Sequence, residues 1–313
     1  MKILFISSGN SENGISPIVK GQGESLFKKG IHIDYFTIKG KGIFGYLKSI
    51  PEIRKQLKKK KYDVVHAHYS LSAFAASLAG AKPLVVSLMG SDVMSKSYYN
   101  ILIKFFNWAF WSSIIVKSED MKKTLRISRA VVIPNGVDFK KYIPIKQKEA
   151  LCITGWDKTK KHILFAADPE RYVKNFKLAK DAFESLGNPD LDLHVLRNIS
   201  SELMPFYYNA ADLVILTSLW EGSPNVIKEA MACNKTVIST NVGDVSNLFS
   251  DLEGCYIAQF SLQDMKSKIN RGLDFIDLQR STDGRTKLIQ LGLDSESVAD
   301  KIINLYNNSL DFQ

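Results

Sequence analysis

The sequence predicts an α/β fold made of two Rossmann-like domains, each built on a parallel sheet. Short apolar runs alternate with helical stretches along the whole chain, and this alternation is typical of parallel sheets covered by helices on both faces. The length of 313 residues exceeds what one ordinary core uses, and the apolar share of 45% is enough for two cores. We expect one domain over 1–145, a second over 146–296, and a C-terminal helix over 297–313 that packs back on the first.

Apolar runs mark the expected strands. In the first half these runs fall at 3–7, 32–38, 63–66, 83–88, 113–116 and 131–138. In the second half they fall at 162–166, 192–196, 213–216, 236–239 and 255–258. The last run of the first half closes into an Asn135-Gly136 turn, and the polar, Lys-rich stretch that follows, to about residue 149, is interpreted as the interdomain connection.

The positive charge lies in the first half. Residues 1–145 hold 23 Lys and Arg against 9 Asp and Glu, whereas residues 146–313 hold 19 against 23. The densest run, Lys58–Lys61, follows a stretch over 43–53 with amphipathic helical spacing, which favours anionic lipid head groups as a partner. A solvated helix end explains the same run equally well. Nucleic acid is not expected, because no recognised binding module accompanies the charge.

No run of about eighteen apolar residues is present, so we expect no membrane span. The start of the chain reads as a first strand and lacks the pattern of a signal peptide. Three cysteines are an odd number without metal-ligand spacing, and we expect small thiols of the core in a reducing compartment. The expected location is the cytoplasm, with peripheral contact at the inner face of the cell membrane.

The richest candidate segment is 217–230, directly after an expected strand. Ser223 and Pro224 form a favourable helix start, with Ser223 as the N-cap. Free amides and the positive helix end would bind a diphosphate. Glu221 and Glu229 would accept hydrogen bonds from sugar and ribose hydroxyls, although a solvated loop glutamate and a surface helix glutamate are the simpler interpretation of these two residues alone.

A second candidate segment, 168–175, also follows an expected strand. Arg171 and Lys174 are placed there to neutralise phosphate oxygens, and ordinary surface charge is the alternative. The loop 7–16 has the glycine spacing of a P-loop, but Ile15 replaces the required lysine. Its Gly14 is interpreted as a flexible position near ligand or as a plain turn residue.

Two histidines and an aspartate pair complete the candidates. His66 and His68 end an expected strand, and we expect them on opposite faces, with one of them contacting ligand. Asp190 and Asp192 form an Asp-x-Asp pair, the type that binds a divalent metal in some sugar transferases. Here the pair introduces a strand after an Asn-Pro turn, so we assign no metal.

Several segments together resemble the signature of retaining glycosyltransferase family 4, which has the GT-B fold of two Rossmann-like domains facing each other across a cleft. The specific match is Glu221 and Glu229 with seven residues between them. It is flanked by 208–213, 230–233 and 236–244, and weaker matches in the first half fall at 63–68, 90–92, 118–121 and 133–138.

The resemblance implies a role for each matching residue. Lys174 with Arg171 would bind the donor diphosphate, Glu221 would contact the transferred sugar, and Glu229 would bind the ribose hydroxyls. Residues that would surround the donor are Gly14, Gly222, Ser223, Pro224, Asn225 and Val226, with the loop 197–201 at the base. Two positions depart from the family: Met89 precedes Gly90 where the family has histidine, and Asp168 stands where the family has its arginine.

The implied reaction transfers a sugar from a nucleotide-diphosphate sugar to a glycan or lipid-linked acceptor with retention of configuration. A donor phosphate oxygen would take the acceptor's proton, and no metal or other cofactor is required. Bacterial surface polysaccharide synthesis is the expected setting. Two alternatives stay open: a sugar-nucleotide epimerase of the same fold, and a non-catalytic subunit that binds a membrane or another transferase.

Overall fold

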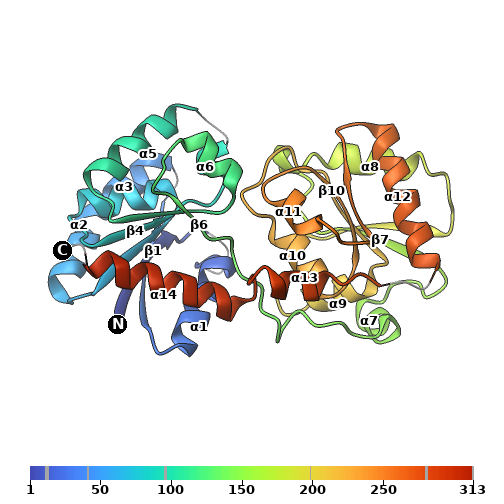
Figure 1. Ribbon diagram of the computed structural model, residues 1–313, viewed down its shortest axis with the longest axis horizontal. Helices are drawn as coiled ribbons and strands as arrows, with labels where there is room; N and C mark the ends of the chain where they lie inside the picture. The colour runs from blue at the N-terminus through green and yellow to red at the C-terminus, as the bar shows by residue number, and fades with distance from the viewer. Residues whose placement is uncertain (11–13, 41, 95–96, 198, 279–280, 312–313) are drawn as a thin grey trace. The chain divides into compact units, whose positions relative to one another are not determined.

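The computed structural model describes residues 1–10, 14–40, 42–94, 97–197, 199–278 and 281–311 (Figure 1). The chain forms two compact units, Met1–Gly136 with Ser295–Gln313 and Val137–Asp294. The division follows the Asn135-Gly136 turn and precedes the expected boundary at 145. Residues after the turn belong to the second unit, since Arg285 donates hydrogen bonds to the carbonyls of Phe139 and Tyr142.

The first unit is built on a six-stranded parallel sheet of order β2-β1-β3-β4-β5-β6. Its strands are β1 (Lys2–Ser8), β2 (His32–Ile38), β3 (Val64–His68), β4 (Leu84–Ser87), β5 (Ser113–Val116) and β6 (Val131–Val132). Its helices are α1 (Pro17–Lys28), α2 (Gly42–Lys59), α3 (Ser70–Leu78), α4 (Ser91–Met94), α5 (Ser97–Ala109), α6 (Glu119–Leu125) and α14 (Ser295–Asp311).

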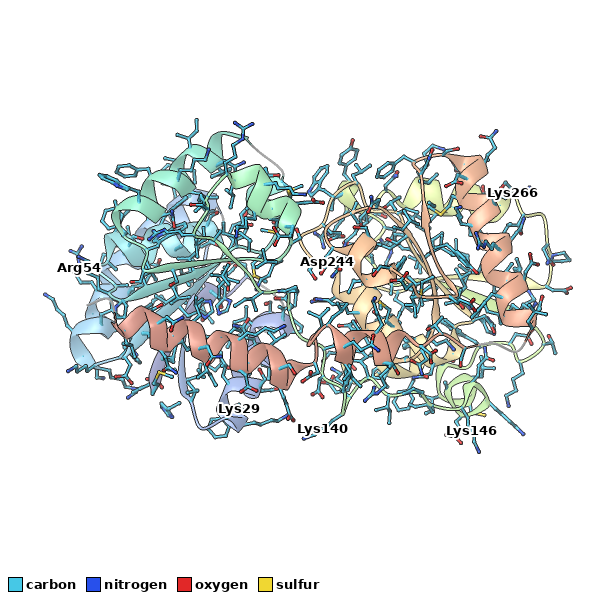
Figure 2. All side chains as sticks on the ribbon, viewed as in Figure 1. Lys29, Arg54, Lys140, Lys146, Asp244 and Lys266 are labelled. Carbon is cyan, nitrogen blue, oxygen red and sulfur yellow. The ribbon has the colours of Figure 1, made fainter. Side chains whose placement is uncertain are left out.

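Both faces of this sheet are covered, which explains the continuous apolar run of β1. Leu4 and Ile6 pack into the core on one face, whereas Ile3 and Phe5 pack into the core on the other, as the two-residue period of a strand requires. In Figure 1, α1 and α14 cover one face and α2, α3 and α5 the other. The C-terminal helix thus lies in the first unit, where Asp300 of α14 pairs with Lys29 at 2.9 Å (Figure 2).

The second unit is built on a five-stranded parallel sheet of order β11-β10-β9-β7-β8. Its strands are β7 (Lys161–Phe165), β8 (Leu191–Val195), β9 (Leu213–Leu216), β10 (Thr236–Thr240) and β11 (Cys255–Ala258). Its helices are α7 (Gln147–Thr154), the 3₁₀ turn η1 (Tyr172–Lys174), α8 (Phe176–Glu184), α9 (Met204–Ala210), α10 (Asn225–Ala232), α11 (Val245–Phe249), α12 (Leu262–Asp277) and α13 (Gly284–Gln290).

Strand order fixes where each unit can bind a ligand. In the second sheet the chain goes from β7 outward to β8 and then returns to pair β9 on the other side of β7. In the first sheet it goes from β1 to β2 and returns to β3 in the same way. The loops after the two flanking strands diverge at such a switch point, and ligands bind in the resulting crevice at the carboxyl ends of the strands.

The α/β fold with two parallel-sheet, Rossmann-like units is confirmed, and the strands of the second half agree with the expected runs to within about one residue. The expected strand at 131–138 is only two residues long, because Pro134 has no backbone N–H to donate to the ladder. The expectation that all three thiols lie in the core is wrong, since Cys152 is exposed. Among the described residues, no helix combines the length and apolar character that a membrane crossing requires.

Candidate functional site

The loops after β7 and β9 are bonded to each other at the switch point of the second unit. The amide of Leu219 donates to the carbonyl of Val173 at 2.8 Å. The hydroxyl of Thr217 lies 3.0 and 2.9 Å from the carbonyls of Lys174 and Asn175. These bonds fix the 3₁₀ turn that ends at Lys174 against the segment that leads to α10. The candidate segment 217–230 begins with Thr217, but no role is predicted for this residue from the sequence, although a hydroxyl at the end of a buried strand is a signal for such a tether.

Lys174 and Glu221, predicted from separate segments, contact each other. The Lys174 ammonium donates to Glu221 Oε1 at 2.5 Å, with only 11% and 19% of the two side chains exposed. The Ser218 hydroxyl donates to the same carboxylate oxygen at 2.7 Å. An ammonium has three N–H donors, so Lys174 can keep Glu221 and also bind an anion. Arg171 is exposed at the start of η1.

The start of α10 differs from the predicted cap. The helix begins at Asn225, so Pro224 stands at the N-cap position and Ser223 precedes it. The Ser223 hydroxyl instead donates to Asp244 Oδ2 at 2.7 Å and accepts from Lys228 Nζ at 2.9 Å. The prediction of Ser223 as the N-cap is therefore wrong, because a buried lysine and a carboxylate compete for its hydroxyl. First-turn amides of a helix have no acceptor within the helix. Pro224 at the N-cap position has no side-chain oxygen that could accept a hydrogen bond from them.

The loop after β10 packs against the 218–224 loop that leads to α10. Gly243 has a φ of 60°, and a Cβ added to it would lie 2.6 Å from the carbonyl oxygen of Gly222. The Thr240 hydroxyl donates to the carbonyl of Ser218 at 2.7 Å. Only glycine permits both the left-handed backbone and this close approach, so the 241–244 loop holds the 218–224 loop in one position.

Glu229 accepts hydrogen bonds from two tyrosines, a contact that was not predicted from the sequence. The Tyr208 hydroxyl donates to Glu229 Oε2 at 2.8 Å, and Tyr142 forms a second side-chain hydrogen bond to the carboxylate. Burial raises the pKa of Glu229 above its ordinary value, while the two tyrosines oppose the shift. The tyrosines orient the carboxylate and leave it lone pairs for further donors. Val226, one helical turn earlier, packs partly buried against the adjoining core.

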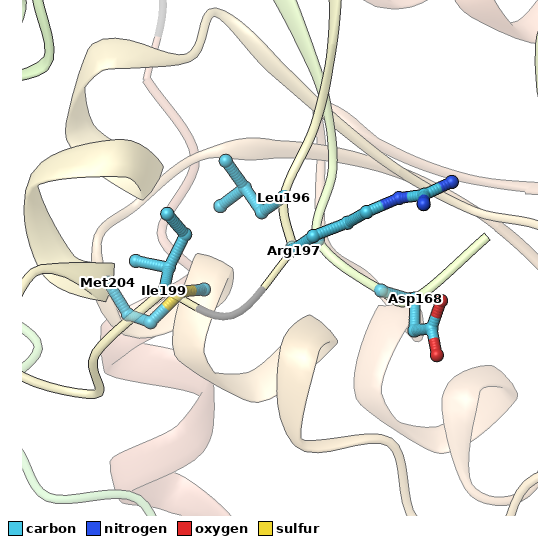
Figure 3. A pocket seen from close by; sticks show the side chains of 7 residues that line it. Asp168, Leu196, Arg197, Ile199 and Met204 are labelled. Carbon is cyan, nitrogen blue, oxygen red and sulfur yellow. The ribbon is translucent and has the colours of Figure 1, made fainter. Parts of the chain in front are cut away.

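A pocket of about 360 Å³ lies at the carboxyl ends of β7 and β8 (Figure 3). It is lined by Ala166, Ala167, Asp168, Leu196, Arg197, Ile199 and Met204. Figure 3 shows the apolar side chains of Leu196, Ile199 and Met204 gathered together, with Asp168 and Arg197 to one side. The volume is within the range of small-molecule sites, and the lining combines apolar surface with a few polar groups. Of the predicted base-contacting loop 197–201, residue 198 lies outside the described residues.

In the first unit the two histidines stack on each other. The ring centroids of His66 and His68 are 4.3 Å apart. The expectation of opposite faces is wrong, because residues two apart on a strand point to the same face. His66 lies within hydrogen-bonding distance of the Tyr306 and Ser87 hydroxyls. Both ring nitrogens of the buried His68 lack a partner among the described residues.

Because these two histidines are buried, we expect the stability of the folded protein to fall in acid. Burial, and then the charge of Lys117, lowers the pKa of His68 from 6.5 to about 3, and burial lowers that of His66 as well. Between pH 3 and 6.5 the unfolded chain therefore binds more protons than the folded chain, so stability falls as the pH drops below 6.5. For His68 alone we expect a loss of about 2 kcal/mol between pH 7 and pH 5, measured by urea unfolding. His68→Leu should reduce this loss, and the exposed control His32→Ala should not; equal losses in wild type and His68→Leu would contradict the assignment.

Met89 and Gly90 lie in a turn held by a buried carboxylate. Asp92 accepts from the amides of Met89 and Gly90 at 3.0 Å each, and from the amide of Ser70 at 3.1 Å. Burial raises the pKa of Asp92 to about 6, and the amides oppose this shift. Gly90 has a φ of 117°, which glycine adopts without strain. The turn thus places Met89 at the carboxyl end of β4.

Gly14 lies three residues before α1, with a φ of 75° and no neighbour within 4 Å of an added Cβ. Residues 11–13 of the same loop lie outside the described residues. For metals, the one described group with suitable ligand spacing is His162, Asp192 and His194. His162 and His194 hydrogen-bond each other at 3.0 Å, and Asp192 pairs with Lys160 at 2.9 Å. Each of these three side chains therefore already has a partner within the protein.

Comparison with known families accounts for this architecture. Residues 19–141 match the model described as Glycosyltransferase Family 4, and residues 191–283 match the model described as Glycosyl transferases group 1. The first match lies in the first unit except for its last five residues, and the second match lies within the second unit. The second match contains the loop after β9 and all of α10.

Individual relatives and solved structures are consistent with these family matches. A UDP-Gal:alpha-D-GlcNAc-diphosphoundecaprenol alpha-1,3-galactosyltransferase of Escherichia coli is 28% identical over 83% of this chain and 76% of its own length. The putative teichuronic acid biosynthesis glycosyltransferase TuaC of Bacillus subtilis is 26% identical over 67% of this chain and 61% of its own. Sucrose-phosphate synthase from Thermosynechococcus elongatus matches with a TM-score of 0.87 at 17% identity, over 100% of both chains. Anabaena HepE in complex with UDP and glucose matches with a TM-score of 0.75 at 17% identity, over 98% of this chain and 99% of its own. The chain is therefore a member of glycosyltransferase family 4 with the GT-B fold.

Proposed function

We propose that the second unit binds a nucleotide-diphosphate sugar, and that the enzyme transfers its sugar to a glycan or lipid-linked acceptor with retention of configuration. The observation that carries the proposal is the convergence of Lys174 and the start of α10 at the switch point between β7 and β9. A cation and first-turn helix amides favour a diphosphate at this place. The pocket of about 360 Å³ at the ends of β7 and β8 offers an apolar surface for the base.

The proposed chemistry is stabilisation of the leaving group. The bond between the sugar's anomeric carbon and the donor phosphate oxygen breaks, and negative charge builds on the nucleoside diphosphate. Lys174, Arg171 and the amides from Gly222 to Asn225 stabilise that charge. The acceptor oxygen bonds to the same face of the anomeric carbon, and its proton passes to the released phosphate oxygen. Glu221 contacts the transferred sugar, and Glu229 accepts hydrogen bonds from the ribose hydroxyls.

This proposal requires no metal, because protein cations and amides neutralise the diphosphate. The proposed acceptor class follows the relatives, one of which is named for a diphosphoundecaprenol acceptor and another for teichuronic acid biosynthesis. Bacterial surface polysaccharide synthesis at the cytoplasmic face of the cell membrane is the corresponding setting.

The surface of the first unit supports a membrane contact. On α5, Ile101, Phe105 and Trp108 are 70%, 54% and 81% exposed, and their spacing places them on one side of the helix. On α2, Phe44 is 79% exposed, and exposed lysines follow toward the helix end at Lys59. Apolar side chains beside lysines are the arrangement that binds anionic bilayers.

Vesicle sedimentation tests the membrane contact. We expect binding to phosphatidylglycerol-containing vesicles that falls with added salt, and little binding to phosphatidylcholine alone. Trp108→Ser combined with Phe105→Ser should weaken binding by about tenfold or more. The matched control is Phe260→Ser, an exposed aromatic of the second unit. Equal binding to both vesicle types, or an unchanged affinity of the double variant, would remove the membrane contact from the proposal.

A product assay tests the function itself. The full chain is incubated with sugar nucleotides, lipid-linked diphosphate acceptors and EDTA, and products are analysed by mass spectrometry and NMR. The proposal predicts a glycosylated acceptor with the donor's anomeric configuration, at a rate unaffected by EDTA. An altered sugar nucleotide formed without acceptor would identify an epimerase. Inverted configuration, or activity lost with EDTA and restored by a metal, would contradict the corresponding part of the mechanism.

A further inference from the structure

Lys228 is a fully buried lysine inside the helix that the proposed donor site uses. It lies on α10, one residue before Glu229, and its side chain is 0% exposed. Its ammonium donates to the Ser223 hydroxyl at 2.9 Å. Burial lowers the pKa of Lys228 to about 8, while the carboxylates of Asp244 and Glu229 oppose the shift. A buried charge of this kind requires compensation by partners, and here the partners are carboxylates of the candidate site.

The Ser223 hydroxyl links this lysine to Asp244. A hydroxyl carries one proton, and that of Ser223 goes to Asp244 Oδ2 at 2.7 Å while its oxygen accepts from Lys228. Asp244 (labelled in Figure 2) lies in the loop that Gly243 packs directly against Gly222. The hydrogen-bond chain from ammonium to hydroxyl to carboxylate therefore passes through the 222–224 turn at Ser223.

The carboxylate of Asp244 is unfavourable for binding a diphosphate nearby, because like charges repel strongly where water is excluded. Asp244 lies in a loop and Glu229 on α10, both in the proposed donor site, and each bears a negative charge when ionised. Lys228 is the buried cation that interacts electrostatically with both of them. Its position cannot be explained by solvation of its own ammonium, because that group is enclosed by protein.

We propose that Lys228 is a positioning residue for the donor diphosphate: through Ser223 it neutralises and holds Asp244, so that the 222–224 turn accepts an anion. This inference rests on the proposed function. It makes the contribution of Lys228 electrostatic, and the contribution therefore depends on the charge of the ligand. Lys228 itself contacts Ser223 and not the donor.

Isothermal titration of the full chain tests the inference. The probes are the best-binding member of UDP, GDP and ADP, and the uncharged nucleoside of the same base. Lys228→Met replaces the buried charge by an apolar chain of similar length. We expect it to weaken diphosphate binding by at least about tenfold and to change nucleoside binding by less than about threefold. Lys228→Met with Asp244→Asn should recover most of the lost affinity, because the hydroxyl of Ser223 keeps an acceptor while the uncompensated charge is gone.

Each outcome has one meaning. Equal losses for diphosphate and nucleoside in Lys228→Met, or no recovery in the double variant, would overturn the inference and leave the proposed function intact. If wild-type protein bound none of the three diphosphates, the proposed function would fail and the inference with it. Should Lys228→Met unfold, as judged by circular dichroism, the comparison of wild type with Asp244→Asn replaces it: stronger diphosphate binding in Asp244→Asn is expected, and weaker or unchanged binding would overturn the inference.

Discussion

Lys174→Met is expected to lower turnover by about a hundred- to a thousandfold, the usual cost of removing one donor that stabilises developing negative charge. The lysine is the cation that the 3₁₀ turn and the Thr217 tether hold at the switch point. Its loss removes the proposed stabilisation of the leaving diphosphate and also leaves the Glu221 carboxylate without its ion-pair partner. Initial rates at saturating donor and acceptor measure the effect.

Lys177→Met is the matched control, since Lys177 lies three residues later, is exposed and pairs with Asp181 on the surface of α8. Surface ion pairs of this type contribute little, so activity should stay within about twofold. The double variant Lys174→Met with Glu221→Gln separates stability from catalysis, because it leaves no unpaired carboxylate. Turnover of the double variant well below that of Glu221→Gln alone supports the catalytic role of Lys174, whereas turnover equal to that of Glu221→Gln would reduce Lys174 to a structural partner of Glu221.

Glu229→Gln is expected to weaken nucleoside diphosphate binding by about ten- to a hundredfold, the value of hydrogen bonds to a charged acceptor. Tyr208 and Tyr142 orient this carboxylate, so its remaining lone pairs point in a fixed direction. The proposed partners are the ribose hydroxyls. Titration with a nucleoside diphosphate and with its 2′,3′-dideoxy analogue measures whether these hydroxyls are the groups concerned.

In wild type the dideoxy analogue should bind about ten- to a hundredfold more weakly, and in Glu229→Gln the two ligands should bind about equally. Glu184→Gln, on the exposed surface of α8, provides the control and should retain full discrimination. A Glu229→Gln variant that still distinguishes the two ligands as wild type does would place the ribose elsewhere.

The fold was accessible from the sequence because the central strands of both sheets are buried on both faces. Such strands read as continuous apolar runs, and β7 to β11 were located to within about one residue. The end of the first domain was harder to locate. A polar, Lys-rich stretch is typical of a linker, but the carbonyls of Phe139 and Tyr142 accept hydrogen bonds from Arg285 of the second unit. Hydrogen bonds between residues so far apart in the sequence cannot be inferred from composition.

The candidate site was accessible only in part. Lys174 and Glu221 each follow a strand, which placed them at the carboxyl edge, but their direct contact depends on β9 pairing with β7. Ser223 had the local sequence of an N-cap, and Lys228 and Asp244 overrode it through tertiary contacts. The expectation that His66 and His68 lie on opposite faces was wrong for a simpler reason: residues two apart on a strand share a face, and only adjacent residues lie on opposite faces.

The most direct test is a crystal structure of the full chain with a nucleoside diphosphate bound. We expect diphosphate oxygens within about 3 Å of Lys174 Nζ and of first-turn amides of α10. We also expect the base against Leu196 and Met204, and the ribose beside Glu229. A diphosphate bound in the first unit, or at the opposite end of the second sheet while Lys174 stays paired with Glu221 alone, would contradict the proposed donor site.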